Sequence, residues 1–498
     1  MPPVTQAVLL SWSMPPAASF ALAVIALIYL RGWVLLRRAR VPFLPPWRAV
    51  SFFLGLLALW IALASPIDTF DGFVLTAHML QHMVLMMLAP PLILLGAPLV
   101  PLVRGLPVFA AREFAGPFIN WRVATRIGNA LTHPLVALLL MGGVMFAWHT
   151  PRLYELALAS SSWHQVEHAC FFLVSLVFWW PVIQPWPSRA LWPRWTVVPY
   201  LLIADLQNTA LSAILVFSDR VLYPSYATVP RLFGLSALHD QAAAGAIMWV
   251  MGSFAFVVPA IVIAIQCLQG NRPNIALSQK SEYPSLEMLV SFSQRLSFGG
   301  RLLRRRLSAR AVEAISFLVL FALAGLSLAH LASSASDDDD QAVRLQENFA
   351  RFTVTLFAPA GELERGSSDF SVLVQDRKTQ EVLLDSAVTL RAEQNGNPVA
   401  IEPVRATMSP ENRLLQTASL DFPTAGNYTM EVNLQQGGTQ ASFSLPLQVG
   451  KADAGFSLPW PYGVLMALSA VLLFAYVRRR LTAPVDGIHS SAAIPIQR

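Results

Sequence analysis

Two histidines lie four residues apart inside a long apolar stretch, residues 72–96. On a helix, His78 and His82 would point to the same side. An ionisable side chain within a membrane span is costly, so it indicates a functional site or a partner on another helix. Met79 and Met83 add thioethers, and imidazole with thioether sulfur favours copper, above all Cu(I), over magnesium or calcium. The stretch therefore predicts a Cu(I) site with the two methionines as auxiliary ligands.

Further histidines lie at the ends of other apolar stretches. His164 and His168 repeat the four-residue spacing, His149 ends the preceding stretch, and His239 begins a later one. If the stretches cross a membrane in alternate directions, all six histidines gather at one end of one bundle. The remaining three histidines, His133, His330 and His489, fall elsewhere. We therefore expect the metal ligands to be His78, His82, His149, His164 and His168, with His239 as a sixth candidate.

Acidic residues lie at the same predicted end of the bundle: Asp68, Asp71, Glu155, Glu167, Asp219 and Asp240. Solvated loop charge or helix capping is the ordinary role of such residues. A carboxylate can also bind the second nitrogen of a ligating imidazole and fix its tautomer. Asp68, Glu167 and Asp240 are the candidates for this supporting role.

The composition indicates a membrane protein. The chain has 498 residues, of which 55% are hydrophobic and 13% charged. Residues 337–453 contain 17 acidic and 9 basic side chains, although the whole chain has a formal net charge of +6. This split favours an acidic soluble domain joined to a bundle whose basic loops lie against anionic membrane lipid, and it gives no reason to expect a nucleic-acid partner. The two cysteines, at 170 and 267, form neither a disulfide framework nor a CxxC motif.

Nine apolar stretches are long enough to cross a hydrocarbon core of about 30 Å. They are residues 17–35, 49–65, 72–96, 133–149, 164–182, 195–217, 240–267, 312–332 and 458–477. The segments after the odd-numbered stretches contain 22 Lys and Arg residues, whereas the short connections after the second, fourth and sixth stretches contain three. The positive-inside rule then predicts a periplasmic N-terminus, a cytoplasmic C-terminus and histidines at the periplasmic side.

The predicted fold is an all-α polytopic membrane helix bundle, with a seven-helix core and two further spans, that carries a periplasmic all-β immunoglobulin-like sandwich. The seven-span domain covers residues 1–268, a basic cytoplasmic loop follows at 269–311, and the eighth span is 312–332. The sandwich covers 337–452, the ninth span 458–477 and a cytoplasmic tail 478–498. The eighth span has the layout of a secretory signal, so it either stays in the membrane or is cut near Ala335.

Short alternating segments predict the sandwich: residues 350–358, 369–377, 382–392, 397–408, 413–421, 427–435 and 440–449. Within them, Asp421 to Tyr428 resembles the tyrosine corner of immunoglobulin-like domains. The domain contains neither histidine nor cysteine. We therefore expect it to dock a partner in the periplasm rather than to bind a second metal.

Several local motifs carry a family resemblance. They are Ser65-Pro66-Ile67-Asp68, the run from Ala77 to Pro98, His133-Pro134-Leu135, Trp148-His149-Thr150-Pro151, His164 to His168, Phe217 to Tyr226 and Leu238 to Gly245. Together they resemble the CtaG-type polytopic cytochrome c oxidase assembly factors over about residues 17–268. The resemblance implies a bacterial inner-membrane protein that assembles a haem-copper oxidase by handling copper for its catalytic subunit. A periplasmic copper donor protein is then expected as a second partner.

No nucleophile elbow or other catalytic motif is present, which favours a protein that is not an enzyme. Three alternatives to copper delivery stay open. Histidines on separate helices also hold haem in membrane redox proteins. A transporter of copper or protons would use Asp205, in the sixth stretch, as a midplane site. In a scaffold, the histidines would only bond one helix to another.

Overall fold

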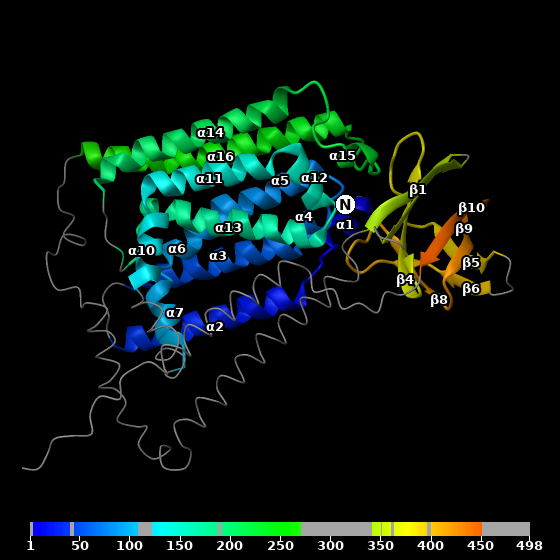
Figure 1. Cartoon of the computed structure of the whole chain (residues 1–498), viewed down its shortest axis with the longest axis horizontal. Coiled ribbons are helices and arrows are strands. Elements are labelled where there is room, and N and C mark those ends of the chain that lie inside the picture. The colour runs from blue at the N-terminus through cyan, green and yellow to red at the C-terminus, as the bar shows by residue number, and fades with distance from the viewer. Residues whose placement is uncertain are drawn as a thin grey trace, which may run out of the picture. The chain divides into compact units, whose positions relative to one another are not determined.

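The computed structural model describes residues 3–39, 44–107, 122–186, 188, 192–269, 341–349, 351–359, 363–395 and 400–450. The predicted eighth and ninth spans, the basic loop before them and the C-terminal tail lie outside these residues. Each of the first seven apolar stretches forms a helix, and these helices lie side by side in one bundle (Figure 1).

The bundle is built from seven long helical segments. They are α2 (Pro16–Arg38), α3 (Pro46–Ala64), α5 (Leu75–Met83) with η1 (Val84–Leu88) and α6 (Ala89–Leu95), α11 (Pro134–Trp148), α13 (Ser161–Ile183), α14 (Val197–Phe217) and α16 (Ala237–Leu268). Short helices connect them: α4 (Pro66–Thr69), α7 (Leu99–Gly105), α10 (Arg122–Leu131), α12 (Pro151–Leu158), η3 (Arg194–Thr196) and α15 (Ser225–Thr228), with α1 (Pro3–Leu9) before the first span. Among the described residues, six helical segments are long and apolar enough to cross a membrane, and a bent pair would make a seventh.

The bent pair is the predicted fourth span. Helix α11 has 15 residues, so it is only about 22 Å long, and α12 continues from it at an angle of 70°. Pro151 explains the bend, because a proline disfavours helical backbone at the residue before it, here Thr150. The bend leaves His149 at the junction of the two helices.

The third span contains a π-helical segment directly after the His78–His82 pair. Pro90 and Pro91 do not end the helix, which continues as α6 to Leu95. Pro90 has no amide hydrogen to donate to the carbonyl four residues earlier, that of Met86. The Trp179 indole donates to that carbonyl oxygen at 3.0 Å. A side chain of α13 thus replaces the missing backbone hydrogen bond, so the helix continues through the proline pair.

Small residues let α2 and α7 approach closely. A Cβ atom added to Gly32 would lie 1.8 Å from the Pro101 carbonyl oxygen, and one added to Gly105 would lie 1.8 Å from the Ile28 carbonyl oxygen. Membrane helices commonly use such small residues where two backbones touch.

The C-terminal domain contains two five-stranded sheets. One has the order β1 (Gln341–Phe349), β2 (Phe352–Pro359), β4 (Gly366–Asp376), β8 (Gln416–Phe422), β7 (Thr407–Met408). The other has the order β3 (Leu363–Glu364), β10 (Thr439–Gly450), β9 (Gly426–Gln436), β5 (Ala387–Gln394), β6 (Ala400–Arg405). All pairings are antiparallel except the short one between β3 and β10.

Several strands differ from the sequence prediction, among them the short β3, which lies between two predicted segments. Strand β1 was not predicted, because its alternation is weak and it follows an acidic linker. The predicted strand 397–408 is divided at the buried Ala406 into β6, which pairs with β5, and β7, which pairs with β8 in the other sheet. The tyrosine corner is confirmed, since the buried Tyr428 hydroxyl donates to the Thr424 carbonyl oxygen at 2.8 Å.

Candidate metal centre

Two helices bring four imidazoles together. The spacing of four residues places His78 and His82 on one side of α5, with ring centroids 4.4 Å apart, and places His164 and His168 on one side of α13, 4.1 Å apart. The two pairs face each other, with 5.1 Å between His78 and His164 and 5.4 Å between His82 and His168. These four side chains are called the histidine cluster below.

His149 lies beside the cluster at the end of α11. Its ring centroid is 6.3 Å from that of His82. Its Nδ1 atom is 2.7 Å from the Met145 carbonyl oxygen, which can only accept, so Nδ1 must carry the hydrogen. The buried Nε2 atom therefore holds a lone pair, and it has no hydrogen-bond partner among the described residues. The Tyr223 hydroxyl donates to the His149 carbonyl oxygen at 3.0 Å and holds this junction in place.

A tyrosine fixes the tautomer of His78 in the same way. The Tyr226 hydroxyl donates to the Asp71 carbonyl oxygen at 2.6 Å and lies 3.3 Å from His78 Nδ1. Burial raises the pKa of Tyr226 well above its ordinary value, so the hydroxyl keeps its single hydrogen. Because that hydrogen is directed to Asp71, His78 Nδ1 must be the donor to the tyrosine oxygen. The Nε2 atom of His78 then carries a lone pair, as a metal ligand requires.

Glu167 lies among these imidazoles. Its side chain is fully buried, with one carboxyl oxygen 3.7 Å from His78 Nε2 and the other 3.9 Å from His82 Nε2. Neither carboxyl oxygen has a hydrogen-bond partner in the described part of the chain, and the same holds for both ring nitrogens of His82. A buried carboxylate facing the lone pair of His78 is unfavourable unless a cation lies between them. The arrangement therefore suits a bound metal ion or a proton.

Two sets of three ligand atoms have spacings that fit a metal ion. One set is His78, His82 and His168, and the other is Asp71, His78 and His164. Within each set, the ligand atoms lie within 4.8 Å of one another. Three atoms at the corners of a triangle of that size would move inward by about 0.8 Å each to reach the metal–nitrogen distance of about 2.0 Å. Side-chain rotation alone can supply such a movement.

Aromatic side chains enclose the cluster. The Tyr154 ring lies 5.1 Å from that of His78 and stacks on Tyr223 at 4.0 Å. The Phe171 ring lies 4.6 Å from that of His82. Met79 and Met83 are also buried and belong to the large apolar cluster of the bundle. The imidazoles are thus surrounded by apolar groups, which strengthen electrostatic attraction to a cation.

Asp240 anchors the helix that carries His78 and His82. Val74, the residue before α5, cannot cap the helix with its side chain. Asp240 on α16 accepts from the backbone amide of Leu75 at 2.7 Å and from that of Thr76 at 3.0 Å. Its own helix is capped by Ser236. Asp240 therefore supports the site through the start of α5, not through an observed contact with an imidazole.

Asp68 also acts through a neighbour. It accepts from the Gln81 side-chain amide at 2.7 Å and from the Ser13 hydroxyl at 3.0 Å. Gln81 additionally donates to the Ala62 carbonyl oxygen at 2.8 Å, which lies four residues before Pro66 and so lacks the usual helical donor. These bonds join α3, α4 and α5 next to His82.

The other candidates lie apart from the cluster. His239 is exposed, and neither of the two ligand sets includes it. His133 lies at the other end of α11, where its ring contacts Trp192 at 5.1 Å. Asp205 accepts from the Ser253 hydroxyl at 2.7 Å, so this acid of the sixth span has a hydrogen-bond partner on α16.

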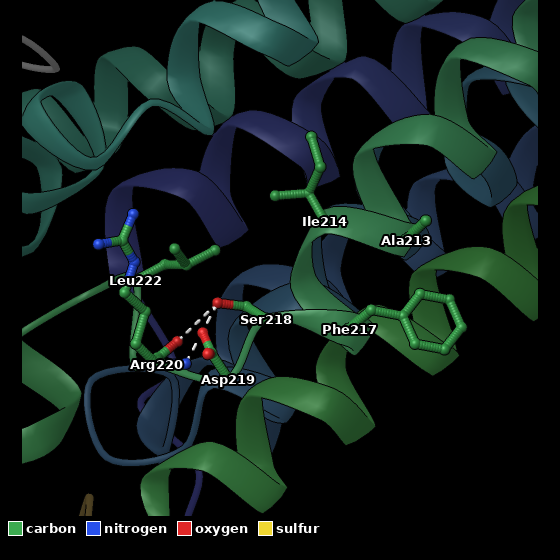
Figure 2. Close-up of a pocket in the computed structure, with 7 residues that line it drawn as sticks. All are labelled: Ala213, Ile214, Phe217, Ser218, Asp219, Arg220 and Leu222. Carbon is green, nitrogen blue, oxygen red and sulfur yellow. Dashed lines mark hydrogen bonds between the residues drawn. The ribbon is translucent and has the colours of Figure 1, made fainter.

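A separate hollow of about 590 Å³ lies where α14 ends (Figure 2). Ser218 and Arg220 close its loop, with the Ser218 hydroxyl donating to the Arg220 carbonyl oxygen at 2.8 Å. None of the histidines lines it. The lining residues are Ala213, Ile214, Phe217, Ser218, Asp219, Arg220 and Leu222. Gln241 ties the same loop to α16 by accepting from the Leu222 amide at 2.7 Å.

Two residues of the site, Asp71 and Tyr226, were not among the site candidates predicted from the sequence. Asp71 is a member of the second ligand set, with a carboxyl oxygen 3.5 Å from His164 Nε2. Tyr226 contacts His78 across 148 residues of sequence. The central place of Glu167 had a signal in the sequence, because it lies three residues after His164 and so on the same side of the helix.

The comparisons with known proteins agree with the family resemblance. Residues 27–270 match the model of the family described as cytochrome c oxidase caa3 assembly factor (Caa3_CtaG). An uncharacterized protein of Mycobacterium bovis is 25% identical over 280 residues, which are 54% of this chain and 41% of the relative. An uncharacterized protein of Mycobacterium leprae is 24% identical over 268 residues, which are 51% of this chain and 39% of the relative. This chain thus covers less than half the length of these relatives. No solved structure matches.

Proposed function

Because residues 27–270 match the model of the cytochrome c oxidase caa3 assembly factor family, we propose that this chain binds Cu(I) at the histidine cluster and delivers it to a haem-copper oxidase. In this proposal, a periplasmic protein donates the copper and the catalytic subunit of the oxidase receives it. The chain is a multi-pass protein of the bacterial inner membrane, and the histidine cluster faces the periplasm.

The observation that carries the proposal is the placement of Glu167. Its buried carboxyl group lies within 4 Å of two imidazole nitrogens, and Tyr226 directs the lone pair of one of them, His78 Nε2, toward it. A monovalent cation held by neutral imidazoles is balanced by one carboxylate, so Cu(I) leaves the buried site with no net charge. Neutral nitrogen donors suit copper, whereas magnesium and calcium require mainly oxygen donors.

The enclosure suits delivery of a metal ion. Aromatic rings shield the imidazoles from water. Donor groups of a partner protein can replace the imidazole ligands one at a time. Copper then passes between proteins without release as a free ion. Since the proposal needs no bond-making step in the protein, it describes a binding protein and not an enzyme.

The test is a copper measurement on the full chain purified in detergent under reducing conditions. We expect about one Cu(I) per chain in the wild type and almost none in the His78→Ala/His82→Ala variant. The matched control is His133→Ala, which removes an imidazole at the other end of α11 and should leave the copper content unchanged. Equal copper in the wild type and the double variant would overturn the proposal.

Delivery is tested in cells. In a strain that depends on this protein, the double variant should lower the copper content of the purified oxidase while the haem content stays the same. An oxidase with normal copper in that strain would contradict delivery. A Soret absorption band from the purified wild-type protein would assign the histidines to haem instead.

A further inference from the structure

The two ligand sets in the metal centre share one residue, His78. The first set is completed by His82 and His168, and the second by Asp71 and His164. The ligand atoms of each set lie within 4.8 Å of one another, so each is compact enough to hold an ion. Below, the set of His78, His82 and His168 is called the inner set, and the set of Asp71, His78 and His164 is called the outer set.

The sets differ in their access to solvent. The side chains of His164 and Asp71 are 23% and 16% exposed, whereas those of His78 and His82 have no exposed surface. The ligand nitrogens of His168 and His164 are both buried, so the exposed surface of the outer set belongs to Asp71 and to the rest of the His164 ring. An ion that comes from outside the protein therefore meets Asp71 and the His164 ring before the fully buried His78 and His82.

The sets also differ in donor chemistry. The outer set offers two imidazoles and one carboxylate, and the inner set offers three imidazoles. A carboxylate oxygen is a hard donor and binds Cu(I) less well than imidazole does. In the inner set, Glu167 lies beside the ligands and balances the charge of the ion without replacing a nitrogen donor. The affinity for Cu(I) should therefore rise from the outer set to the inner set.

The shared ligand allows transfer without release. His78 is held by Tyr226, whose own position is fixed by the bond to the Asp71 carbonyl oxygen. An ion bound to His78 can exchange Asp71 and His164 for His82 and His168 one ligand at a time. The redox state of copper does not change in this exchange, and no bond within the protein is made or broken.

We propose that Asp71 and His164 form an exchange station through which Cu(I) reaches and leaves a holding site made by His78, His82 and His168. This inference rests on the proposed function and adds the direction and order of ligand exchange. It assigns Asp71 a role in the rate of loading and unloading, and His82 and His168 a role in the affinity.

The experiment compares rates with affinities in the full-length protein in detergent. Cu(I) is supplied and removed with a chromophoric Cu(I) chelator, and its absorbance is followed by stopped flow and at equilibrium. We expect Asp71→Asn/His164→Gln to keep one Cu(I) with an affinity within about threefold of wild type, while loading and extraction slow at least tenfold. We expect His82→Gln/His168→Gln to weaken the affinity at least a hundredfold without slower exchange.

Two further variants make the outcomes distinct. Asp219→Asn removes an exposed carboxylate beside the hollow at the end of α14 and should change neither rate nor affinity. The single variant Asp71→Asn preserves side-chain size and should show slower exchange even if the double variant folds poorly. The inference is overturned if the outer variants lose affinity as much as the inner variant does, or if their rates stay within twofold of wild type. A wild-type protein that binds no Cu(I) would instead contradict the proposed function itself.

Discussion

Replacing Asp240 by alanine tests whether α16 holds the metal centre in place through the start of α5. The carboxylate accepts from two backbone amides, those of Leu75 and Thr76, at 2.7 and 3.0 Å. It is 5% exposed, so water cannot fully replace it. His78 lies three residues after Leu75, within the first turn that these bonds secure. The variant should therefore lower both the stability of the bundle and its affinity for copper.

The size of the effect follows from the number of bonds lost. Removal of a capping side chain costs about 0.5–2 kcal/mol, and a buried donor left without an acceptor costs about 1–3 kcal/mol. With two amides affected, we expect the free energy of unfolding to fall by about 2–4 kcal/mol. For a bundle of this size, the melting temperature should fall by about 5–10 °C. If the substitution destabilises the copper-bound state by about 1.4 kcal/mol more than the copper-free folded state, the affinity for Cu(I) drops tenfold.

The assay is thermal unfolding in detergent together with Cu(I) competition. Asp240→Asn should fall between wild type and Asp240→Ala, because one amide oxygen can still accept from one backbone amide. Asp219→Ala, an exposed acid at the same end of the bundle, should leave both quantities unchanged. If Asp240→Ala melts within about 1 °C of wild type and binds copper equally well, Asp240 does not support the site.

Three further substitutions test how the two domains are built. Gly32→Ala should lower the melting temperature of the bundle by several degrees, because its Cβ would lie 1.8 Å from the Pro101 carbonyl oxygen. Trp179→Phe should cost about 1–3 kcal/mol, since it leaves the buried Met86 carbonyl oxygen beside the proline pair without a donor. Tyr428→Phe should speed hydrogen exchange in strands β8 and β9 of the full chain, because the tyrosine corner loses its bond.

Controls exist for the first two of these substitutions. Gly143→Ala places a Cβ where nothing lies within 4 Å, so its melting temperature should match wild type. Trp195→Phe changes an indole that is 62% exposed and should be nearly neutral. If a variant and its control lose the same melting temperature or the same free energy of unfolding, the effect is a general one of the substitution and does not come from the named contact.

The secondary structure was largely readable from the sequence because it depends on local patterns. A run of apolar residues long enough to span a membrane must satisfy its backbone groups internally, which leaves the helix as the available form. The alternation of apolar and polar residues predicted most strands of the C-terminal domain for a similarly local reason. Strand β1 was not predicted because its weak alternation did not reveal the pairing with β2.

The sequence by itself also determined that His78 pairs with His82 and that His164 pairs with His168, since a spacing of four residues is one turn of any helix. Only the tertiary structure decided what faces those pairs. The rotation and depth of α5 against α13 depend on contacts between residues far apart in the chain, such as Asp240 with the start of α5 and Tyr226 with His78. Local patterns do not encode such contacts, and for that reason only the folded bundle showed that Asp71 lies beside His164.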